Sequence, residues 1–365
     1  MASNRALTRA ARAQQDEFYT TTGDIERELM YYREHFTGKK ILCNCDDPFE
    51  SKFFEYFAIR FQAYGLAKLT ATSYAGSPIA QRQLLLFEED KPARERTPYC
   101  ATLCELKDYN GDGRTDRDDV IWALQNLPGA LRKLEGDGDF RSRECIELLK
   151  DADIVVTNPP FSLFREYVAL LMKYSKKFII IGNFNAITYK EIFPLFKQNQ
   201  IWLGYGFAHG NAYFTAPSED VERFADGVYN PEKQTVKFRN CCWFTNLPIK
   251  KRYWPIPIYK HYTPEEYPHY DNYDAIEISR TDLIPCDYDG VMGVPITFMD
   301  KYNPEQFEIL GITQRDSPLK TKVYTREDSP KFGDLNSRAV IRENDGRLRS
   351  TYARILIRRI IDTNA

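Results

Sequence analysis

The sequence of 365 residues lacks several features that would place it in a specialised class of protein. It has no apolar run near the roughly 20 residues that a membrane-spanning helix needs, so we expect no membrane anchor. It has only four histidines, and none of its eight cysteines stands in CxxC spacing. Reduced thiols are therefore expected rather than a metal centre or a disulfide framework. Its 50 basic and 52 acidic residues nearly cancel, so net charge alone indicates no polyanionic partner.

The first fifteen residues carry three arginines but lack the apolar core of a secretory signal. We interpret them as a basic arm rather than a targeting segment, and we expect a cytoplasmic protein. The length suggests two domains, and 43% hydrophobic residues are enough for a sizeable core, which excludes a disordered or fibrous chain. Aromatic residues reach 14%, and such rings suit either a core or stacking on bases.

Apolar runs of strand length alternate with helical patterns through roughly the first 205 residues. The strand-like runs are 40–45, 66–73, 99–106, 152–156 and 177–181, and the helical patterns are 51–63, 143–150 and 162–174. Alternation of this kind predicts an α/β fold with a parallel, doubly wound sheet.

After about residue 215, prolines, tyrosines and basic residues become dense and the regular alternation fades. Segment 236–260 contains six cations, no Asp or Glu, and interleaved Trp and Tyr residues. A second segment, 338–359, contains seven arginines. Such patches can bind nucleic acid, or they can be a solvated face with packed rings. The residues that we expect to contact nucleic-acid phosphates and bases are Lys250, Lys251, Arg252 and Trp254.

The sequence Asn158-Pro159-Pro160-Phe161 directly follows the predicted strand 152–156. In open α/β sheets, ligands bind beyond the carboxyl ends of the strands. The amide oxygen of Asn158 and the carbonyl oxygen of Pro159 can both accept hydrogen bonds from one exocyclic amine, and Phe161 can stack on the ring that carries it. The prolines remove competing N–H donors. The alternative is a rigid turn with no chemistry.

This motif and several other stretches resemble the EcoRI-type adenine-specific DNA methyltransferases. The matching stretches are 16–20 (DEFYT), 31–36 (YYREHF), 43–48 (CNCDDP), 136–142 (GDGDFRS), 158–161 (NPPF), 185–190 (NAITYK), 287–295 (DYDGVMGVP) and 298–304 (FMDKYNP). The resemblance implies a seven-stranded Rossmann-like catalytic domain over 1–225 and a mixed target-recognition region over 226–365. It also implies S-adenosylmethionine as the methyl donor and adenine N6 in double-stranded DNA, flipped out of the helix, as the acceptor.

The resemblance assigns roles to individual residues. The catalytic residues would be Asn158, Pro159, Pro160 and Phe161, and the cofactor-binding residues would be Phe18, Tyr19, Thr20, Asn44, Asp46, Asp47, Pro48, Asp139 and Phe140. Two departures stand out. Segment 44–51 has no glycine where most relatives have a glycine-rich turn. Segment 70–74 offers only hydroxyls where an acidic ribose ligand is expected. For 139–140, a polar loop without a ligand is an equal alternative.

Other functions remain open on sequence grounds. Residues 108–119 match the spacing of a calcium-binding loop, with Asp119 in place of the usual final Glu, although a polar turn is the preferred interpretation. Motif 158–161 also occurs in RNA and protein-glutamine methyltransferases, and a catalytically silent nucleic-acid-binding protein is a further alternative. We expect a monomer that needs no metal. A cognate restriction endonuclease, or an orphan or phage origin, is left open.

Overall fold

The computed structural model describes residues 19–48, 51–74, 98–207, 211–215, 229–230, 232 and 235–361. The chain forms two compact units. Unit 1 comprises Met1–Phe184 and Leu203–Ile249, and unit 2 comprises Asn185–Trp202 and Lys250–Ala365. The two units do not coincide with the predicted catalytic domain, 1–225, and target-recognition region, 226–365. Residues 226–249 lie in unit 1, and residues 185–202 lie in unit 2. The assignment of functions to 1–225 and 226–365 stays a prediction.

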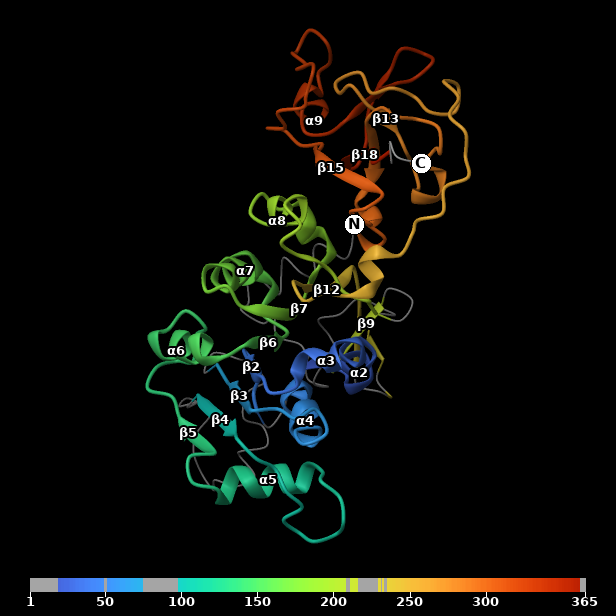
Figure 1. Cartoon of the computed structure of the whole chain (residues 1–365). Coiled ribbons are helices and arrows are strands. Elements are labelled where there is room, and N and C mark those ends of the chain that lie inside the picture. The colour runs from blue at the N-terminus through green and yellow to red at the C-terminus, as the bar shows by residue number, and fades with distance from the viewer. Residues whose placement is uncertain are drawn as a thin grey trace. The chain divides into compact units, whose positions relative to one another are not determined.

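Unit 1 is built around a large mixed sheet with strand order β5-β4-β3-β2-β6-β7-β12-β8 (Figure 1). The strands are β2 (Lys40–Asn44), β3 (Lys68–Thr72), β4 (Tyr99–Leu103), β5 (Leu131–Lys133), β6 (Ile154–Thr157), β7 (Lys177–Asn183), β8 (Trp202–Leu203) and β12 (Cys241–Thr245). The central strands β3, β2, β6 and β7 run parallel to one another. All five predicted strands are present.

Helices connect the parallel strands. They are α4 (Lys52–Ile59), between β2 and β3, α6 (Arg143–Asp151), before β6, and α7 (Phe164–Lys173), between β6 and β7. Since β3 and β7 lie on opposite sides of the β2–β6 pair, right-handed crossovers put α4 and α7 on opposite faces of the sheet. Figure 1 shows this arrangement. The three predicted helices are therefore confirmed, with the start of 162–174 forming a 3₁₀ turn, Phe161–Leu163.

The predicted parallel sheet is confirmed for the four central strands but is wrong at both edges, and the expected count of seven strands is not confirmed. β4 pairs antiparallel with β3, β5 antiparallel with β4, and β12 antiparallel with β7. The large sheet has eight strands within the described residues. A run of apolar residues predicts that a strand forms, but its direction depends on which neighbour it pairs with, and that is decided in the tertiary fold.

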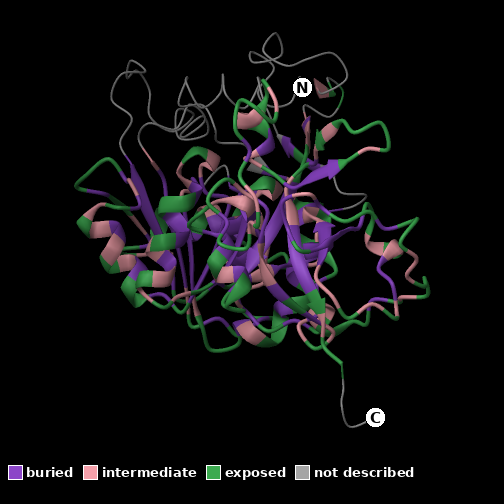
Figure 2. Cartoon of the chain, turned by 90° about the horizontal axis from the view of Figure 1, so that it is seen from above, coloured by how far each residue is buried: buried purple, intermediate pink, exposed green. Residues whose placement is uncertain are grey.

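Local sequence explains why these elements form. In β6, every residue is buried, and Figure 2 shows the strands as the most buried part of the fold. Helix α4 begins at Ser51, whose side chain accepts a hydrogen bond from the N–H of Phe53 at 3.1 Å. Its residues Phe53, Phe54 and Phe57 are buried, as expected for an amphipathic helix that covers a sheet.

Unit 1 also contains a second sheet with strand order β1-β9-β11-β10. Its strands are β1 (Tyr19–Thr20), β9 (Asn211–Thr215), β10 (Tyr229–Asn230) and β11 (Thr235–Arg239). The remaining helices of unit 1 are α2 (Thr22–Leu29), α3 (Arg33–Phe36), α5 (Arg117–Asn126) and the 3₁₀ turn Met30–Tyr32. No described helix of the chain combines the length and the apolarity that crossing a membrane requires.

Unit 2 has little regular structure. One sheet has strand order β13-β14-β18-β15, and β16 and β17 form a separate hairpin. The strands are β13 (Ile276–Glu277), β14 (Met292–Pro295), β15 (Phe307–Ile312), β16 (Val340–Arg342), β17 (Leu348–Ser350) and β18 (Arg354–Arg359). The helices are α8 (Phe193–Lys197), α9 (Phe332–Leu335) and the 3₁₀ turns Lys250–Tyr253, Thr281–Leu283 and Ile296–Asp300. A further 3₁₀ turn, Phe184–Thr188, begins in unit 1 and ends in unit 2.

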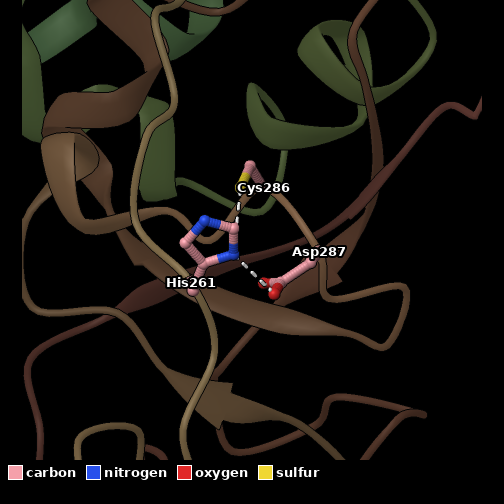
Figure 3. Close-up of side chains that lie close together, drawn as sticks. All are labelled: His261, Cys286 and Asp287. Atoms are coloured by element: carbon pink, nitrogen blue, oxygen red, sulfur yellow. Dashed lines mark hydrogen bonds and ion pairs between the residues drawn. The ribbon is translucent and has the colours of Figure 1, made fainter.

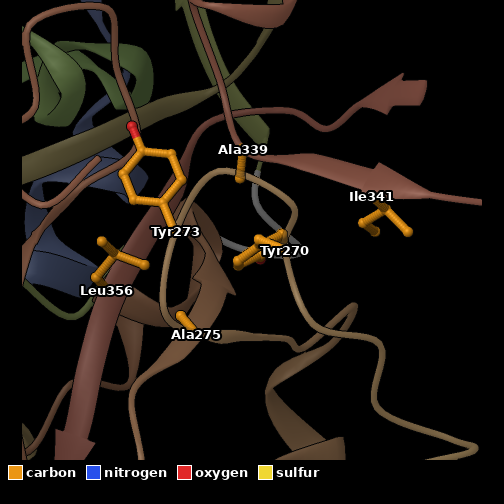
Figure 4. Close-up of a cluster of buried hydrophobic side chains, with 6 residues drawn as sticks. All are labelled: Tyr270, Tyr273, Ala275, Ala339, Ile341 and Leu356. Atoms are coloured by element: carbon orange, nitrogen blue, oxygen red, sulfur yellow. The ribbon is translucent and has the colours of Figure 1, made fainter. Parts of the chain in front are cut away.

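A cluster of buried side chains from β16, β18 and the loop before β13 forms part of the core of unit 2 (Figure 4). A buried ion pair lies beside it, where the guanidinium of Arg354 contacts the carboxylate of Glu277 and Tyr270 donates its hydroxyl hydrogen to the same carboxylate. A side chain at Gly293 would collide with the Tyr270 ring. Gly293, one of the two glycines of motif 287–295, therefore makes room for this network.

Candidate active site

The candidate site lies where β2 and β6 end. The sheet order reverses between these two strands, because β2 continues to β3 on one side and β6 to β7 on the other. Both strands run parallel, so their carboxyl ends meet at one edge of the sheet. This reversal point is where open α/β sheets bind ligands. Segments 45–48 and 158–161, predicted separately as cofactor-binding and catalytic, are thus brought together by the fold.

Hydrogen bonds tie these two segments to each other. The Thr157 hydroxyl, at the end of β6, contacts the main-chain oxygen of Asn44 and lies 2.7 Å from the carboxylate of Asp46. The hydroxyl of Tyr167 on α7 donates to the side-chain oxygen of Asn44. Thr157, Asn44 and Tyr167 are all buried, and burial raises the pKa of Tyr167 well above its ordinary value. The buried, uncharged side chains of Thr157, Asn44 and Tyr167 thus link the ends of β2 and β6 to α7.

The predicted catalytic motif, 158–161, forms a tight turn from β6 into α7. Asn158 and Pro159 are buried, whereas Pro160 and Phe161 are half-buried at the rim. The N–H of Leu163 donates to the carbonyl oxygen of Pro160 at 3.0 Å, which closes the turn. The ring of Phe161 meets the ring of Phe214 on β9 edge to face, with centroids 6.5 Å apart. An amide, a proline carbonyl and a partly exposed ring therefore lie together, as the sequence predicts.

The N-terminal motif reaches the same place through β9. Thr20 on β1 pairs with Phe214, the residue whose ring contacts Phe161. The hydroxyl oxygen of Thr20 is buried and has no hydrogen-bond partner among the described residues, so it is available to a ligand. Tyr19 is described only as part of β1, and Phe18 lies outside the described residues.

The turn after β2 shows how the chain manages without a glycine. Cys45 adopts a left-handed backbone conformation with φ of 64°, which glycine adopts without strain. This conformation leads into Asp46, Asp47 and Pro48, which are all buried. The carbonyl oxygen of Asp47 accepts a hydrogen bond from the N–H of Ser51 at 2.7 Å, just before α4 begins. The turn thus presents two buried carboxyl groups at the edge of the sheet.

Strand β3 contributes a hydroxyl where an acidic residue was expected. Thr72 is the last residue of β3 and pairs with Asn44. Its hydroxyl oxygen is buried and has no hydrogen-bond partner among the described residues. Unsatisfied buried hydroxyls are costly, so Thr72 and Thr20 both mark positions suited to a bound polar molecule.

The loop 136–142 approaches the same edge. A side chain at Gly138 would collide with the carbonyl oxygen of Ser73, just after β3, so the loop can lie this close only with glycine there. The ring of the buried Phe140 meets Tyr167 edge to face, with centroids 5.0 Å apart. Asp139 is paired with Arg141, and these hydrogen bonds hold the pKa of Asp139 below its usual range. The fold therefore brings Phe140 to the site, while the Asp139 carboxylate is engaged by its neighbour.

The donors and acceptors at this edge fit S-adenosylmethionine. Carboxyl groups from Asp46 and Asp47 suit the hydroxyls of a ribose or a positively charged amino group, and either residue can take either partner. Thr20 and Thr72 add hydroxyls, and Phe140 adds an aromatic ring.

The predicted DNA-binding residues lie in unit 2 on the 3₁₀ turn Lys250–Tyr253 and just after it. Lys250 and Trp254 are exposed. Lys251 forms an ion pair with Asp300 at 2.7 Å. Arg252 stacks over the ring of Trp202 at 4.2 Å and is half-buried, and this burial lowers its pKa. The structure therefore places Lys250 and Trp254 at the surface and gives Lys251 and Arg252 contacts within unit 2.

Two further sequence features look different in the fold. The cations of segment 236–260 are divided between the units, with Lys237 and Arg239 on β11 in unit 1. Five of the seven arginines in segment 338–359 form ion pairs with carboxylates, many of them from distant parts of unit 2. The pairs are Arg342–Asp271, Arg347–Asp345, Arg349–Glu343, Arg354–Glu277 and Arg358–Glu308.

The calcium-like loop 108–119 is a self-contained polar turn before α5. The carboxylate of Asp108 accepts hydrogen bonds from the N–H groups of Gly111 and Gly113 at 2.6 and 2.8 Å. The Asp116 side chain caps α5, and the Asp119 carboxylate accepts a hydrogen bond from the N–H of Asp116, which completes a capping box. Main-chain hydrogen bonds lower the pKa of Asp119, the Asp116 N–H contributing most. The carboxylates thus accept hydrogen bonds from the main chain of the loop itself, and the preference for a polar turn over a calcium site stays a prediction.

Sequence reasoning missed several residues that shape the site. Thr157, Tyr167 and Phe214 join segments distant in the sequence, and no local pattern marks them. The sequence also did not predict a second buried polar group of unit 1: Glu28 is fully buried and accepts hydrogen bonds from the Tyr32 hydroxyl and from the N–H groups of Tyr205 and Gly206 at 2.8 to 2.9 Å. Its position on the apolar face of α2 is the one signal that could have identified it.

Known proteins resemble the chain over nearly its whole length. A model of the family described as "Adenine-specific methyltransferase EcoRI" matches residues 6–360. The Type II methyltransferase M.EcoRI of Escherichia coli is 44% identical over 329 residues, which cover 88% of this chain and 94% of that protein. M.MpnI of Mycoplasma pneumoniae is 35% identical, covering 88% and 91%.

M.MgeORF184P of Mycoplasma genitalium, also named a Type II methyltransferase, is 32% identical over 371 residues, covering 97% of this chain and 98% of that protein. No solved structure matches the chain significantly. The family model covers nearly the whole chain, and all three relatives are more than 30% identical to it. The chain therefore belongs to the EcoRI family of adenine-specific methyltransferases.

Proposed function

We propose that this adenine-specific methyltransferase transfers a methyl group from S-adenosylmethionine to N6 of an adenine flipped out of double-stranded DNA. The observation that carries the proposal is the meeting of Asn158 and Pro159, beyond β6, with the carboxyl-bearing turn beyond β2. One segment suits the acceptor amine and the other suits the methyl donor. The Type II naming of the relatives supports a role in restriction–modification.

Catalysis by this site is mainly positioning. When bound, S-adenosylmethionine supplies an electrophilic methyl group on a sulfonium. Asn158 accepts one hydrogen bond from the N6 amine through its side-chain oxygen, and Pro159 accepts another through its carbonyl oxygen. Both acceptors aim the nitrogen lone pair and stabilise the positive charge that develops on nitrogen. Pro160 keeps the turn rigid without offering a competing N–H donor.

Phe161 holds the flipped base by stacking. Its ring is half-buried and is supported edge to face by Phe214, so one face of the ring can receive a base. Stacking of a base on an aromatic side chain is worth about 1–3 kcal/mol, which offsets part of the cost of unstacking adenine from the duplex.

On the donor side, we assign Asp46 and Asp47 to the ribose hydroxyls and the methionine amine, in either order. Thr20, Thr72 and Phe140 complete this part of the site, together with Tyr19, Asn44 and Pro48 as its framework. Phe18 stays a predicted contact next to Tyr19. Asp139 contributes only after it exchanges Arg141 for a ligand, because the two side chains are paired.

Unit 2 is proposed to bind DNA. Lys250 and Trp254 are its foremost candidates for phosphate and base contacts, because both are exposed. Lys251 and Arg252 support the turn that carries them. The relatives come from bacteria, whose DNA lies in the cytoplasm, and on that basis we place the enzyme there.

The test is methyl transfer from tritiated S-adenosylmethionine to duplex DNA, RNA and protein side by side. We expect label in duplex DNA, recovered as N6-methyladenine at one sequence motif. Label recovered only in RNA or in protein glutamine would overturn the proposal and favour the alternative substrates. Asn158→Ala, measured in parallel, separates transfer by this site from a contaminating activity.

A further inference from the structure

A cluster of three potential metal ligands lies in unit 2, outside the site described above. The side chains of His261, Cys286 and Asp287 point toward one another (Figure 3). Their ligand atoms all lie within 4.8 Å of one another. The imidazole Nδ1 of His261 is 2.9 Å from an oxygen of Asp287 and 3.8 Å from the sulfur of Cys286. From this geometry we propose that the three residues bind a divalent metal ion of the zinc class.

The donor set selects the kind of ion. A thiolate and an imidazole favour Zn²⁺ and similar borderline-soft ions over Ca²⁺ and Mg²⁺, which prefer oxygen ligands alone. Zinc bond lengths of about 2.0 to 2.3 Å put the ligand atoms of a tetrahedral site roughly 3.3 to 3.8 Å apart. The Nδ1–sulfur separation already falls in this range. The shorter Nδ1–oxygen separation is that of a hydrogen bond, which the ion would replace.

The surroundings hold the three ligands in place. Asp287 uses one carboxylate oxygen to accept a hydrogen bond from the N–H of Tyr262 at 2.8 Å, and the other oxygen faces His261. The N–H of Cys286 donates to the carbonyl oxygen of Lys260 at 2.7 Å, and Arg359 donates to the carbonyl oxygen of Cys286. Outer hydrogen bonds of this kind orient ligands in metal sites.

The ion would join two segments that are not paired as regular β-strands. Residues 260–262 and 285–287 run side by side through a single isolated bridge between Lys260 and Pro285. Three protein ligands leave a fourth position for water or for another donor. The ion would therefore brace an irregular part of unit 2 and stay accessible to solvent, because His261 and Asp287 are exposed.

The test uses the full-length chain, reduced and freed of metal, with Co²⁺ and Zn²⁺ as the probes. We expect one tightly bound Co²⁺ per chain, with the near-ultraviolet absorption of a thiolate–cobalt bond, and displacement of that ion by Zn²⁺. Cys286→Ser should abolish this absorption. It should also weaken Zn²⁺ binding by more than the roughly 10- to 100-fold that loss of an outer-shell partner costs. His261→Ala and Asp287→Asn should weaken binding as well.

Two matched controls and one replacement make the result decisive. Cys104→Ser and His269→Ala change an exposed cysteine and an exposed histidine elsewhere, so both should keep binding and absorption unchanged. Cys286→His should keep a three-ligand site that binds Zn²⁺ but shows no thiolate absorption. The proposal is overturned if Cys286→Ser binds as tightly as the unchanged chain, or if Cys104→Ser removes the absorption.

Discussion

In unit 1, a buried parallel sheet with helices on both faces brings the active-site segments to one edge, whereas unit 2 is held by a short sheet, hydrogen-bonded tyrosines and paired charges. The central strands β2, β3, β6 and β7 of unit 1 are buried over nearly their whole length. In unit 2, Glu277 and Asp271 each bind the side chain of an arginine more than 70 residues away and accept a hydrogen bond from a tyrosine hydroxyl. The two units thus illustrate two ways to stabilise a chain: one through periodic apolar sequence, the other through specific polar contacts.

The difference also bears on charge. Segments 236–260 and 338–359 look equally basic in the sequence. In the fold, most arginines of the second segment are paired with carboxylates, while Lys250, in the first, is exposed. A count of charges along a chain therefore overstates the positive field of a region whose acidic partners lie elsewhere in the sequence.

The largest expected effect comes from breaking the buried ion pair of unit 2. Arg354→Met leaves the carboxylate of Glu277 buried without its cation, which typically costs about 3–5 kcal/mol. Urea unfolding followed by circular dichroism should show a correspondingly lower free energy of unfolding. The control is Arg358→Met, because Arg358 and Glu308 are both exposed, and such pairs contribute about 1 kcal/mol or less. Equal losses in the two variants would contradict the contrast between buried and surface pairs.

The next effect concerns the chemical step in unit 1. Asn158→Ala should raise the barrier to methyl transfer by about 3–4 kcal/mol, since a preorganised acceptor is lost, while stability and S-adenosylmethionine binding change little. Single-turnover rates with saturating cofactor and DNA measure this directly. Asn126→Ala, which removes an exposed amide from α5, should transfer methyl groups normally. Near-normal rates with Asn158→Ala would remove this residue from catalysis.

Acid should weaken unit 2 through Asp271. Burial by itself would raise the pKa of this carboxyl group, but hydrogen bonds from Lys322, Tyr324 and Arg342 outweigh it and hold the pKa at about 2. The contribution to stability is therefore present above the unfolded value of about 3.9 and is lost as the pH falls toward the folded value. Urea midpoints between about pH 4 and pH 2 should fall less steeply in Asp271→Asn than in the unchanged chain. Parallel curves would contradict the assignment.

A smaller effect tests the two basic segments. Lys250→Gln should reduce the slope of log affinity against log salt for DNA by about one, because one phosphate contact is lost. The methylated sequence should stay the same. Arg347→Gln should leave the slope unchanged, since Arg347 is paired with Asp345. If both variants change the salt slope equally, ion pairing within the fold does not decide which of the two basic segments contacts DNA.

The smallest effect is expected at the turn after β2. Cys45→Gly removes the strain of a left-handed residue, about 1–2 kcal/mol, but adds roughly 0.5–1 kcal/mol of backbone entropy to the unfolded chain. The net gain in stability should therefore lie between about 0 and 1.5 kcal/mol. Cys43→Gly, at a buried strand position with ordinary backbone geometry, should be destabilising in the same thermal unfolding assay. A loss of stability in Cys45→Gly would show that its side chain matters more than its backbone.

Much of unit 1 could be predicted from the sequence. Runs such as 152–156 and 177–181 are apolar enough to be buried strands anywhere, and the family motifs were continuous stretches. The pairing direction of β4 and the contribution of Phe214 could not be predicted, because both depend on segments far apart in the sequence. The role of the Thr157 hydroxyl could not be predicted either, because in the sequence Thr157 is an ordinary strand residue. Only the fold brings it next to Asp46.

The sequence by itself determined the alternation of strands and helices, the motif 158–161 and the family, because these depend on local periodicity and contiguous residues. The tertiary structure alone decided which charges are neutralised and which distant side chains meet. Arg354 pairs with Glu277, and Cys286 lies next to His261, although no sequence pattern links either pair of segments. The physical reason is that apolar burial depends on composition and period, whereas an ion pair or a ligand set depends on individual atoms brought within a few ångströms by the whole fold.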